Sequence, residues 1–178
     1  MINDKQIEIP LSKKKMMLTF LGACVFVILG ILFVLNPEKY TSIIIRNHNI
    51  ILVSGISSIL FFGLVAISIF RKLSDKNAGL IINSEGINDN SSGVSAGFIP
   101  WSDIEEIKIS QVVNQKFLML IVNNPEDYLN KIKNPLKRNA MKMNLKSYGS
   151  PISISSNALQ TNFEDLEKLL VEEMKKYK

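Results

Sequence analysis

The side chains in this sequence best suited to binding an anion lie between Tyr128 and Tyr148. This stretch contains six basic residues and no acidic one: Lys131, Lys133, Lys137, Arg138, Lys142 and Lys146. Each basic residue close to an anionic lipid surface adds about 1 kcal/mol of attraction, so we take these six as candidate lipid- or partner-binding residues. The alternative is a solvated helix face that keeps the domain soluble. Nucleic acid is not an expected partner, because neither a recognition motif nor interleaved aromatic residues accompany the basic residues.

Residues for catalysis or metal binding are sparse. The chain has one cysteine, Cys24, and one histidine, His48, which excludes a zinc site of the usual kind and an internal disulfide. Glu105 and Glu106 are adjacent in an expected strand, so their side chains would point to opposite faces and not converge. The glycines Gly93 and Gly97 lack the following helix and lysine of a phosphate-binding loop. We therefore expect a non-enzymatic protein that needs no cofactor and no metal.

Two uncharged apolar segments, residues 16–35 and 50–70, dominate the first part of the chain. About 20 apolar residues in a helix span the hydrocarbon core of a bilayer, and backbone groups in lipid are satisfied only within a helix or a closed barrel. The short connection, residues 36–49, begins with Asn-Pro and makes the two helices antiparallel neighbours. The spacing of Ser54 and Ser58 would let them approach closely. The sequence therefore predicts a transmembrane hairpin.

Basic residues flank this hairpin unequally. Residues 13–15 are all lysine, and Arg71, Lys72 and Lys76 follow the second apolar segment, whereas the connection holds only Lys39 and Arg46. The excess of Lys and Arg on the cytoplasmic side then places both termini in the cytoplasm and the connection outside. Residues 1–15 are read as a cytoplasmic tail. Neither apolar segment contains an ionisable residue, which favours an anchor over a transporter.

Two other interpretations of the first apolar segment were weighed. Residues 1–33 could be a cleaved signal peptide, but the apolar run exceeds the usual 7–15 residues and no A-x-A cleavage pattern follows it. Residues 21–24, Leu-Gly-Ala-Cys, look like a lipoprotein cleavage and lipidation signal. The chain stays apolar after Cys24 instead of turning polar, so Cys24 is better read as a small residue of the first helix.

Residues 77–178 have the pattern of an α+β domain. Short strands are expected at residues 79–83, 97–101, 104–110, 117–122 and 152–155, with the fourth central and the last at an edge. Residues 87–93 are expected to form a polar tip. Each Asn-Pro pair, at residues 124–125 and 134–135, predicts a helix start. In the second of these helices Leu136, Ala140 and Met143 share one face.

The last part of the chain predicts an amphipathic helix. Residues 161–164, Thr-Asn-Phe-Glu, fit a capping box, acidic residues follow in the first turn, and lysines occupy the last turn. Its apolar residues recur at helical spacing and form one face that we expect to pack on the sheet. They are Phe163, Leu166, Leu169, Leu170, Met174 and Tyr177.

Residues 97–104, Gly-Phe-Ile-Pro-Trp-Ser-Asp-Ile, and residues 80–87 before them resemble the bacterial pleckstrin-homology-like domains, where the former motif marks the region of the third strand. With residues 8–15 and 148–156, the whole layout resembles a family of uncharacterised two-pass bacterial membrane proteins. The resemblance implies a bacterial plasma membrane location and an antiparallel β-barrel or sandwich capped by the C-terminal helix, with Pro100 and Trp101 as strand-bend and core residues. Eukaryotic relatives often bind phosphoinositides through basic residues in the loop between their first two strands, but the corresponding tip here, residues 88–96, contains Asp89 and no Lys or Arg.

These observations predict a membrane-anchored interaction module with a transmembrane hairpin and a cytoplasmic domain at residues 77–178. Its expected partners are the membrane itself and either anionic lipid headgroups or a protein. The alternative is an accessory subunit of a membrane complex, recognised through its hairpin. Fold alone does not decide between them.

Overall fold

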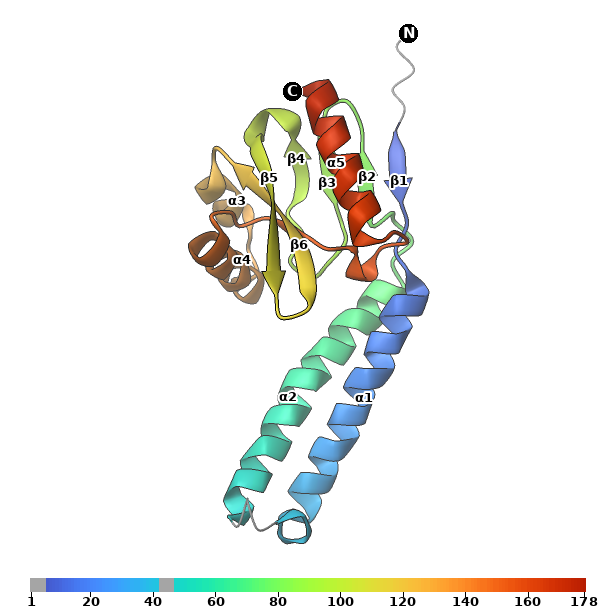
Figure 1. Ribbon diagram of the computed structural model, residues 1–178. Coiled ribbons are helices and arrows are strands. Elements are labelled where there is room, and N and C mark those ends of the chain that lie inside the picture. Colours follow the sequence, from blue (N-terminus) through green and yellow to red (C-terminus); the bar gives the residue numbers. More distant parts are fainter. Residues whose placement is uncertain (1–5, 42–46) are drawn as a thin grey trace. The chain divides into compact units, whose positions relative to one another are not determined.

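The computed structural model describes residues 6–41 and 47–178, and the chain divides into two compact units. Residues 13–41 and 47–76 form a helical unit, called here the helical hairpin. Residues 6–12 and 77–178 form the second unit, called here the β-domain. The fold is α+β, with two long apolar helices, two antiparallel sheets and a C-terminal helix (Figure 1). Arg46, one of the two basic residues expected in the connection, lies outside the described residues.

Both helices of the hairpin are long and apolar enough to cross a membrane. Helix α1 is Lys13–Leu35 and helix α2 is His48–Leu73, and a 3₁₀ turn, Pro37–Tyr40, follows α1. Each is longer than predicted because polar or basic residues extend it beyond the apolar segment. Asn47 starts α2 properly, since its side chain accepts a hydrogen bond from the Asn49 N–H.

The two helices pack through small residues. A methyl group added at Gly30 would lie 2.9 Å from the Gly55 carbonyl oxygen, and one added at Gly55 would lie 2.8 Å from that of Gly30. The Ser58 hydroxyl donates to the Phe26 carbonyl at 2.9 Å. Ser58 therefore lies at the interface as expected, whereas Ser54 is exposed and Gly55 takes its place. Close approach through glycine and serine is typical of helices that associate in lipid.

Within its described residues, 6–12 and 77–178, the β-domain contains seven strands in two antiparallel sheets. The four-stranded sheet has the order β1-β2-β3-β4 and the other has the order β5-β6-β7. The strands are β1 Ile7–Ile9, β2 Leu80–Ile82, β3 Gly86–Asp89, β4 Gly97–Pro100, β5 Ile104–Val112, β6 Gln115–Val122 and β7 Ser153–Ile154. Helices α3 Pro125–Lys131 and α4 Pro135–Tyr148 connect β6 to β7, and 3₁₀ turns cover Trp101–Asp103 and Ser156–Ala158. As predicted, β6 is central and β7 is an edge strand.

Strand β1 corrects the assignment of residues 1–15 to a tail. Ile9 pairs with Leu80 and Ile7 with Ile82 in the antiparallel register. The following residues are also fixed, because the Gln160 N–H donates to the Pro10 carbonyl at 2.9 Å and the Ser12 N–H to the Ala158 carbonyl at 2.7 Å. The helical hairpin is thus inserted in the chain between the first two strands of one sheet.

The extra strand also renumbers the elements expected from the sequence. Residues 87–89, predicted as part of the polar tip, belong to strand β3, Gly86–Asp89, and the rest of the tip joins the third and fourth strands. The segment 97–100 is the fourth strand, where the resemblance implied the third. The numbering differs because β1 precedes its partner β2 by about seventy residues. Residues 86–89 are a strand because they pair with β2 on one side and β4 on the other.

Helix α5, Phe163–Tyr177, covers the core of the β-domain. It lies along the β5–β6 hairpin on one side and the β1–β2 strands on the other (Figure 1). Its residues Phe163, Leu166 and Leu170 are buried together with Leu80 and Leu118 of the two sheets. The predicted apolar face therefore packs inward. The N-cap is Asn162 and not Thr161, because the Asn162 side chain accepts the Asp165 N–H at 2.8 Å.

Candidate functional site

The six basic candidates occupy α3, α4 and the loop between them. Lys131 ends α3, Lys133 lies in the loop, and the other four belong to α4. Both helices start at the proline of an Asn-Pro pair, as the sequence predicted. The Asn134 side chain caps α4 by accepting the N–H groups of Leu136 and Lys137. This cap fixes the start of α4 and hence the direction of every side chain along it.

The outward face of α4 combines apolar and basic residues. Leu136 and Met143 are 72% and 70% exposed, whereas Met141 on the opposite face is fully buried. The apolar face that the sequence predicted is therefore exposed, and the core contact comes from Met141. Lys142 and Lys146 are exposed and lie beside Met143 at helical spacing. We call Leu136, Lys142, Met143 and Lys146 the α4 outer face.

Arg138 and Lys131 make contacts within the β-domain. The Arg138 Nη2 group donates to the Asn130 side-chain oxygen at 2.9 Å, and its Nε atom is buried without a hydrogen-bond partner. The Lys131 Nζ atom lies 5.3 Å from the centre of the Tyr128 ring. The Tyr128 hydroxyl donates to Asp103 at 2.7 Å. Burial raises the pKa of Tyr128, and the Asp103 carboxylate raises it further. These contacts orient the start of α4 rather than form an exposed anion site.

A polar cavity of about 560 Å³ opens at the edge of the four-stranded sheet. Its lining includes Asn77 before β2, Asn88 on β3 and the loop between β3 and β4. Lys137 from α4 is the one basic residue in this lining. This grouping could not be predicted from the sequence, because the tip itself lacks Lys and Arg and Lys137 lies about forty residues later. We call this cavity the β3–β4 cavity.

Asp89 organises the loop that borders this cavity. Its side chain is 2% exposed and accepts the Ser91 N–H at 2.9 Å, the Ser91 hydroxyl at 2.6 Å and the Ala96 N–H at 3.3 Å. Burial raises the pKa of the Asp89 carboxyl above its ordinary value of 3.8, and the hydrogen bonds from Ser91, Ser95 and Ala96 oppose this rise. Both carboxylate oxygens of Asp89 therefore accept hydrogen bonds from donors of the same loop.

The raised pKa of Asp89 predicts an unusual pH dependence of stability. Because the folded state holds the Asp89 proton more tightly than the unfolded state, this group stabilises the fold fully below pH 3.8. The contribution is lost as the pH rises through the raised pKa of the folded state. We expect Asp89→Asn to remove this contribution to the pH dependence of the free energy of unfolding. Urea unfolding of the full chain across a pH series measures that dependence. An unchanged pH profile in the variant would contradict the assignment.

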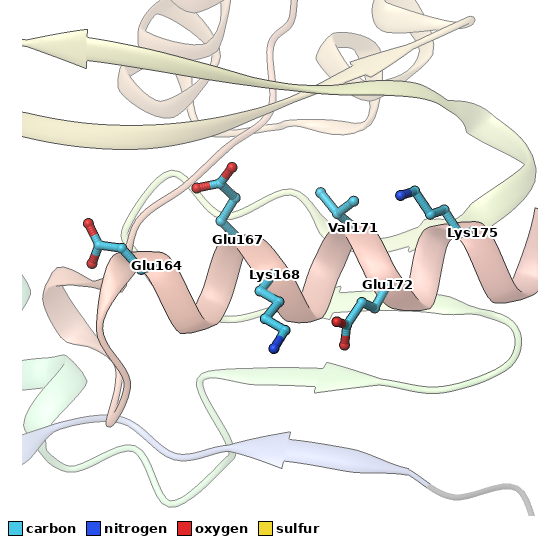
Figure 2. A pocket seen from close by; sticks show the side chains of 6 residues that line it. All are labelled: Glu164, Glu167, Lys168, Val171, Glu172 and Lys175. Atoms are coloured by element: carbon cyan, nitrogen blue, oxygen red, sulfur yellow. The ribbon is translucent and has the colours of Figure 1, made fainter.

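The outward face of α5 carries a shallow depression with mixed charges. Figure 2 shows Glu167 and Val171 pointing to one side of the helix and Lys168 and Glu172 to the other, so the side chains do not converge. Glu164, at the start of the helix, forms an ion pair with Lys116 at 3.1 Å. This face has the character of a solvated surface.

Neither of the carboxylate or metal arrangements considered from the sequence is assembled. Glu105 and Glu106 are both exposed, and Glu106 forms an ion pair with Lys108 at 3.0 Å. Across residues 6–41 and 47–178, no three His, Cys, Asp or Glu side chains are grouped for a metal ion. Comparison of the chain with protein-family models, curated proteins and solved structures finds no match. The α4 outer face and the β3–β4 cavity therefore have to be interpreted from their own chemistry.

Proposed function

We propose that this protein is a membrane-anchored, non-enzymatic binding module whose β-domain contacts anionic lipid through the α4 outer face. The observation that carries this proposal is the exposure of Leu136 and Met143, each more than two-thirds exposed, beside Lys142 and Lys146. An apolar pair flanked by lysines fits the boundary between headgroups and acyl chains, where apolar side chains are buried and lysines meet phosphates.

The helical hairpin supports the membrane anchor. Its two helices bury little of their apolar surface against each other, and large side chains such as Leu18, Phe61 and Leu64 remain more than half exposed. Apolar surface of this extent marks contact with lipid or with another protein. The basic flanks, Lys13 to Lys15 and Arg71 with Lys72, favour an orientation with both termini in the cytoplasm. The bacterial plasma membrane is what the resemblance of residues 97–104 implies.

The layout of the β-domain supports a pleckstrin-homology-like module. Sheets of four and three antiparallel strands followed by a C-terminal helix agree with what the resemblance of residues 97–104 implies. In this proposal β1 supplies the first strand, and the hairpin occupies the connection between the first and second strands. Because fold alone does not imply function, the binding role in this proposal rests on the α4 outer face.

The test uses the full chain in nanodiscs of phosphatidylcholine with or without phosphatidylglycerol. An environment-sensitive fluorophore is attached at Met143→Cys in a Cys24→Ser background. We expect its emission to shift to the blue only when anionic lipid is present, and the shift to fade with added salt, because salt screens charges at the surface. Lys142→Glu with Lys146→Glu should abolish the shift, since about 2 kcal/mol of attraction is replaced by repulsion.

The matched control reverses two other exposed lysines, Lys168 and Lys175 on the outward face of α5. This variant has the same net charge as the α4 variant and should keep the blue shift. A lipid contact by α4 would be refuted if the emission wavelength were the same with and without phosphatidylglycerol. It would also be refuted if the α4 and α5 charge variants lost the blue shift to the same extent. The outer face would then be assigned to a protein partner.

A further inference from the structure

The β3–β4 cavity has the composition of a binding site for a small polar molecule. At about 560 Å³ it falls in the size range of small-molecule sites in proteins. Side-chain amides and hydroxyls border it, from Asn77, Asn88, Asn90, Ser92 and Ser95. The Ser92 and Ser95 hydroxyls also form hydrogen bonds within the loop between β3 and β4, so the amides offer the main contacts to a ligand. Amides and hydroxyls both donate and accept hydrogen bonds, so they suit a ligand that carries hydroxyl groups.

The charges around the cavity indicate a ligand with a single negative group. None of the ion pairs formed within the described part of the chain includes Lys137, the one cation of the lining. Asp89, the one acidic residue of the lining, directs its oxygens at donors of its own loop and is almost fully buried. A lone lysine matches one phosphate group, whereas a polyphosphate would call for several cations.

We propose that the β3–β4 cavity binds a hydroxylated phosphate ester of the glycerophosphate kind, with Lys137 pairing with the phosphate and the Asn and Ser side chains contacting the hydroxyls. This chemistry occurs both in soluble glycerol 3-phosphate and in the headgroup of phosphatidylglycerol. Asn77 lies four residues after Leu73, the last residue of α2, so the cavity is close in the chain to a helix proposed to lie in lipid. The site is separate from the α4 outer face and does not depend on it.

The first test is calorimetric titration of the full chain, in uncharged detergent micelles, with sn-glycerol 3-phosphate. Saturable binding is expected, with much weaker binding of inorganic phosphate and of glycerol because each supplies only half of the contacts. Lys137→Ala should weaken binding by about tenfold or more, as expected for a lost hydrogen bond to a charged group. The matched control is Lys168→Ala, at an exposed lysine of α5 that does not line the cavity, and it should bind like the unaltered chain.

The second test identifies the source of the ester. Full chain released from nanodiscs of mixed phosphatidylcholine and phosphatidylglycerol is analysed by native mass spectrometry. One phosphatidylglycerol retained by the unaltered chain and by Lys168→Ala, but lost from Lys137→Ala, would assign the site to a lipid headgroup. Saturable binding of glycerol 3-phosphate without lipid retention would assign it to a soluble ester.

Three outcomes would overturn the proposal. The first is no heat with glycerol 3-phosphate together with no retained lipid. The second is equal affinity for inorganic phosphate and glycerol 3-phosphate, which would remove the role of the hydroxyls. The third is an equal loss of affinity for glycerol 3-phosphate in Lys137→Ala and Lys168→Ala. Lys137→Gln keeps most of the side chain without its charge. If its unfolding midpoint equals that of the unaltered chain, a loss of binding in this variant does not come from misfolding.

Discussion

Replacing Ile9 and Leu11 with Asp is expected to remove most of the stability of the β-domain. Both side chains are almost fully buried, Ile9 on β1 and Leu11 in a bridge to Leu159. Losing the burial of two such side chains costs about 3–6 kcal/mol, and two buried carboxylates cost more. Since a whole domain is stable by about 5–15 kcal/mol, the change is comparable with the total. Strand β2 would also become an open sheet edge.

Urea unfolding of the full chain in micelles measures this effect. The chain has a single tryptophan, Trp101, which lies in the core of the β-domain, so its emission reports on that unit alone. The control variant, Gln6→Ala with Glu8→Ala, alters two exposed residues of the same segment and should unfold like the original. Equal midpoints for the Asp variant and the control would show that β1 is dispensable.

The same reasoning applies to a soluble form of the domain. Residues 77–178 alone lack β1, so we expect them to be less stable than a chain in which residues 6–12 are joined to residue 77 by a flexible linker. Such a linker is feasible because Ile9 and Leu80 are paired neighbours in the sheet. The boundary of the domain is therefore set by strand pairing across the hairpin and not by the end of the apolar segment.

The sequence contained a signal for β1 that the membrane segments obscured. Ile7, Ile9 and Leu11 alternate with Glu8 and Pro10, which is the period of a half-buried strand. The segment is short and ends directly before three lysines and an apolar helix, and this context favours a cytoplasmic tail over a strand. The helices themselves were predictable from the length and apolar composition of the two segments.

The candidate site was predictable only in part. The start of α4 followed from Asn134 and Pro135, and its basic residues were visible by composition. Which face of α4 is buried was not, because Met141 and Met143 are chemically equal and only packing on the β-domain distinguishes them. The β3–β4 cavity was also hidden, because Lys137 and Asn88 are brought together by the tertiary fold alone.

Replacing Trp101 is the second change with a large expected effect. Its side chain is 2% exposed, its indole N–H donates to the Asn83 carbonyl at 2.8 Å, and its ring stacks on that of Tyr177 at 6.3 Å. It therefore joins the turn after β2, the end of β4 and the last turn of α5. Trp101→Ala is expected to cost about 3–5 kcal/mol, as large aromatic truncations in a core do.

Trp101→Phe separates packing from hydrogen bonding at this position. It keeps an aromatic ring but leaves the Asn83 carbonyl without its indole donor, which costs about 1–3 kcal/mol. Phe98→Ala is the matched control, because Phe98 is an aromatic residue of β4 that is 49% exposed, and its loss should cost less than about 1 kcal/mol. Unfolding followed by circular dichroism compares the three. If Trp101→Ala were as mild as Phe98→Ala, Trp101 would not be part of the core, and its conformation in the structure would be refuted.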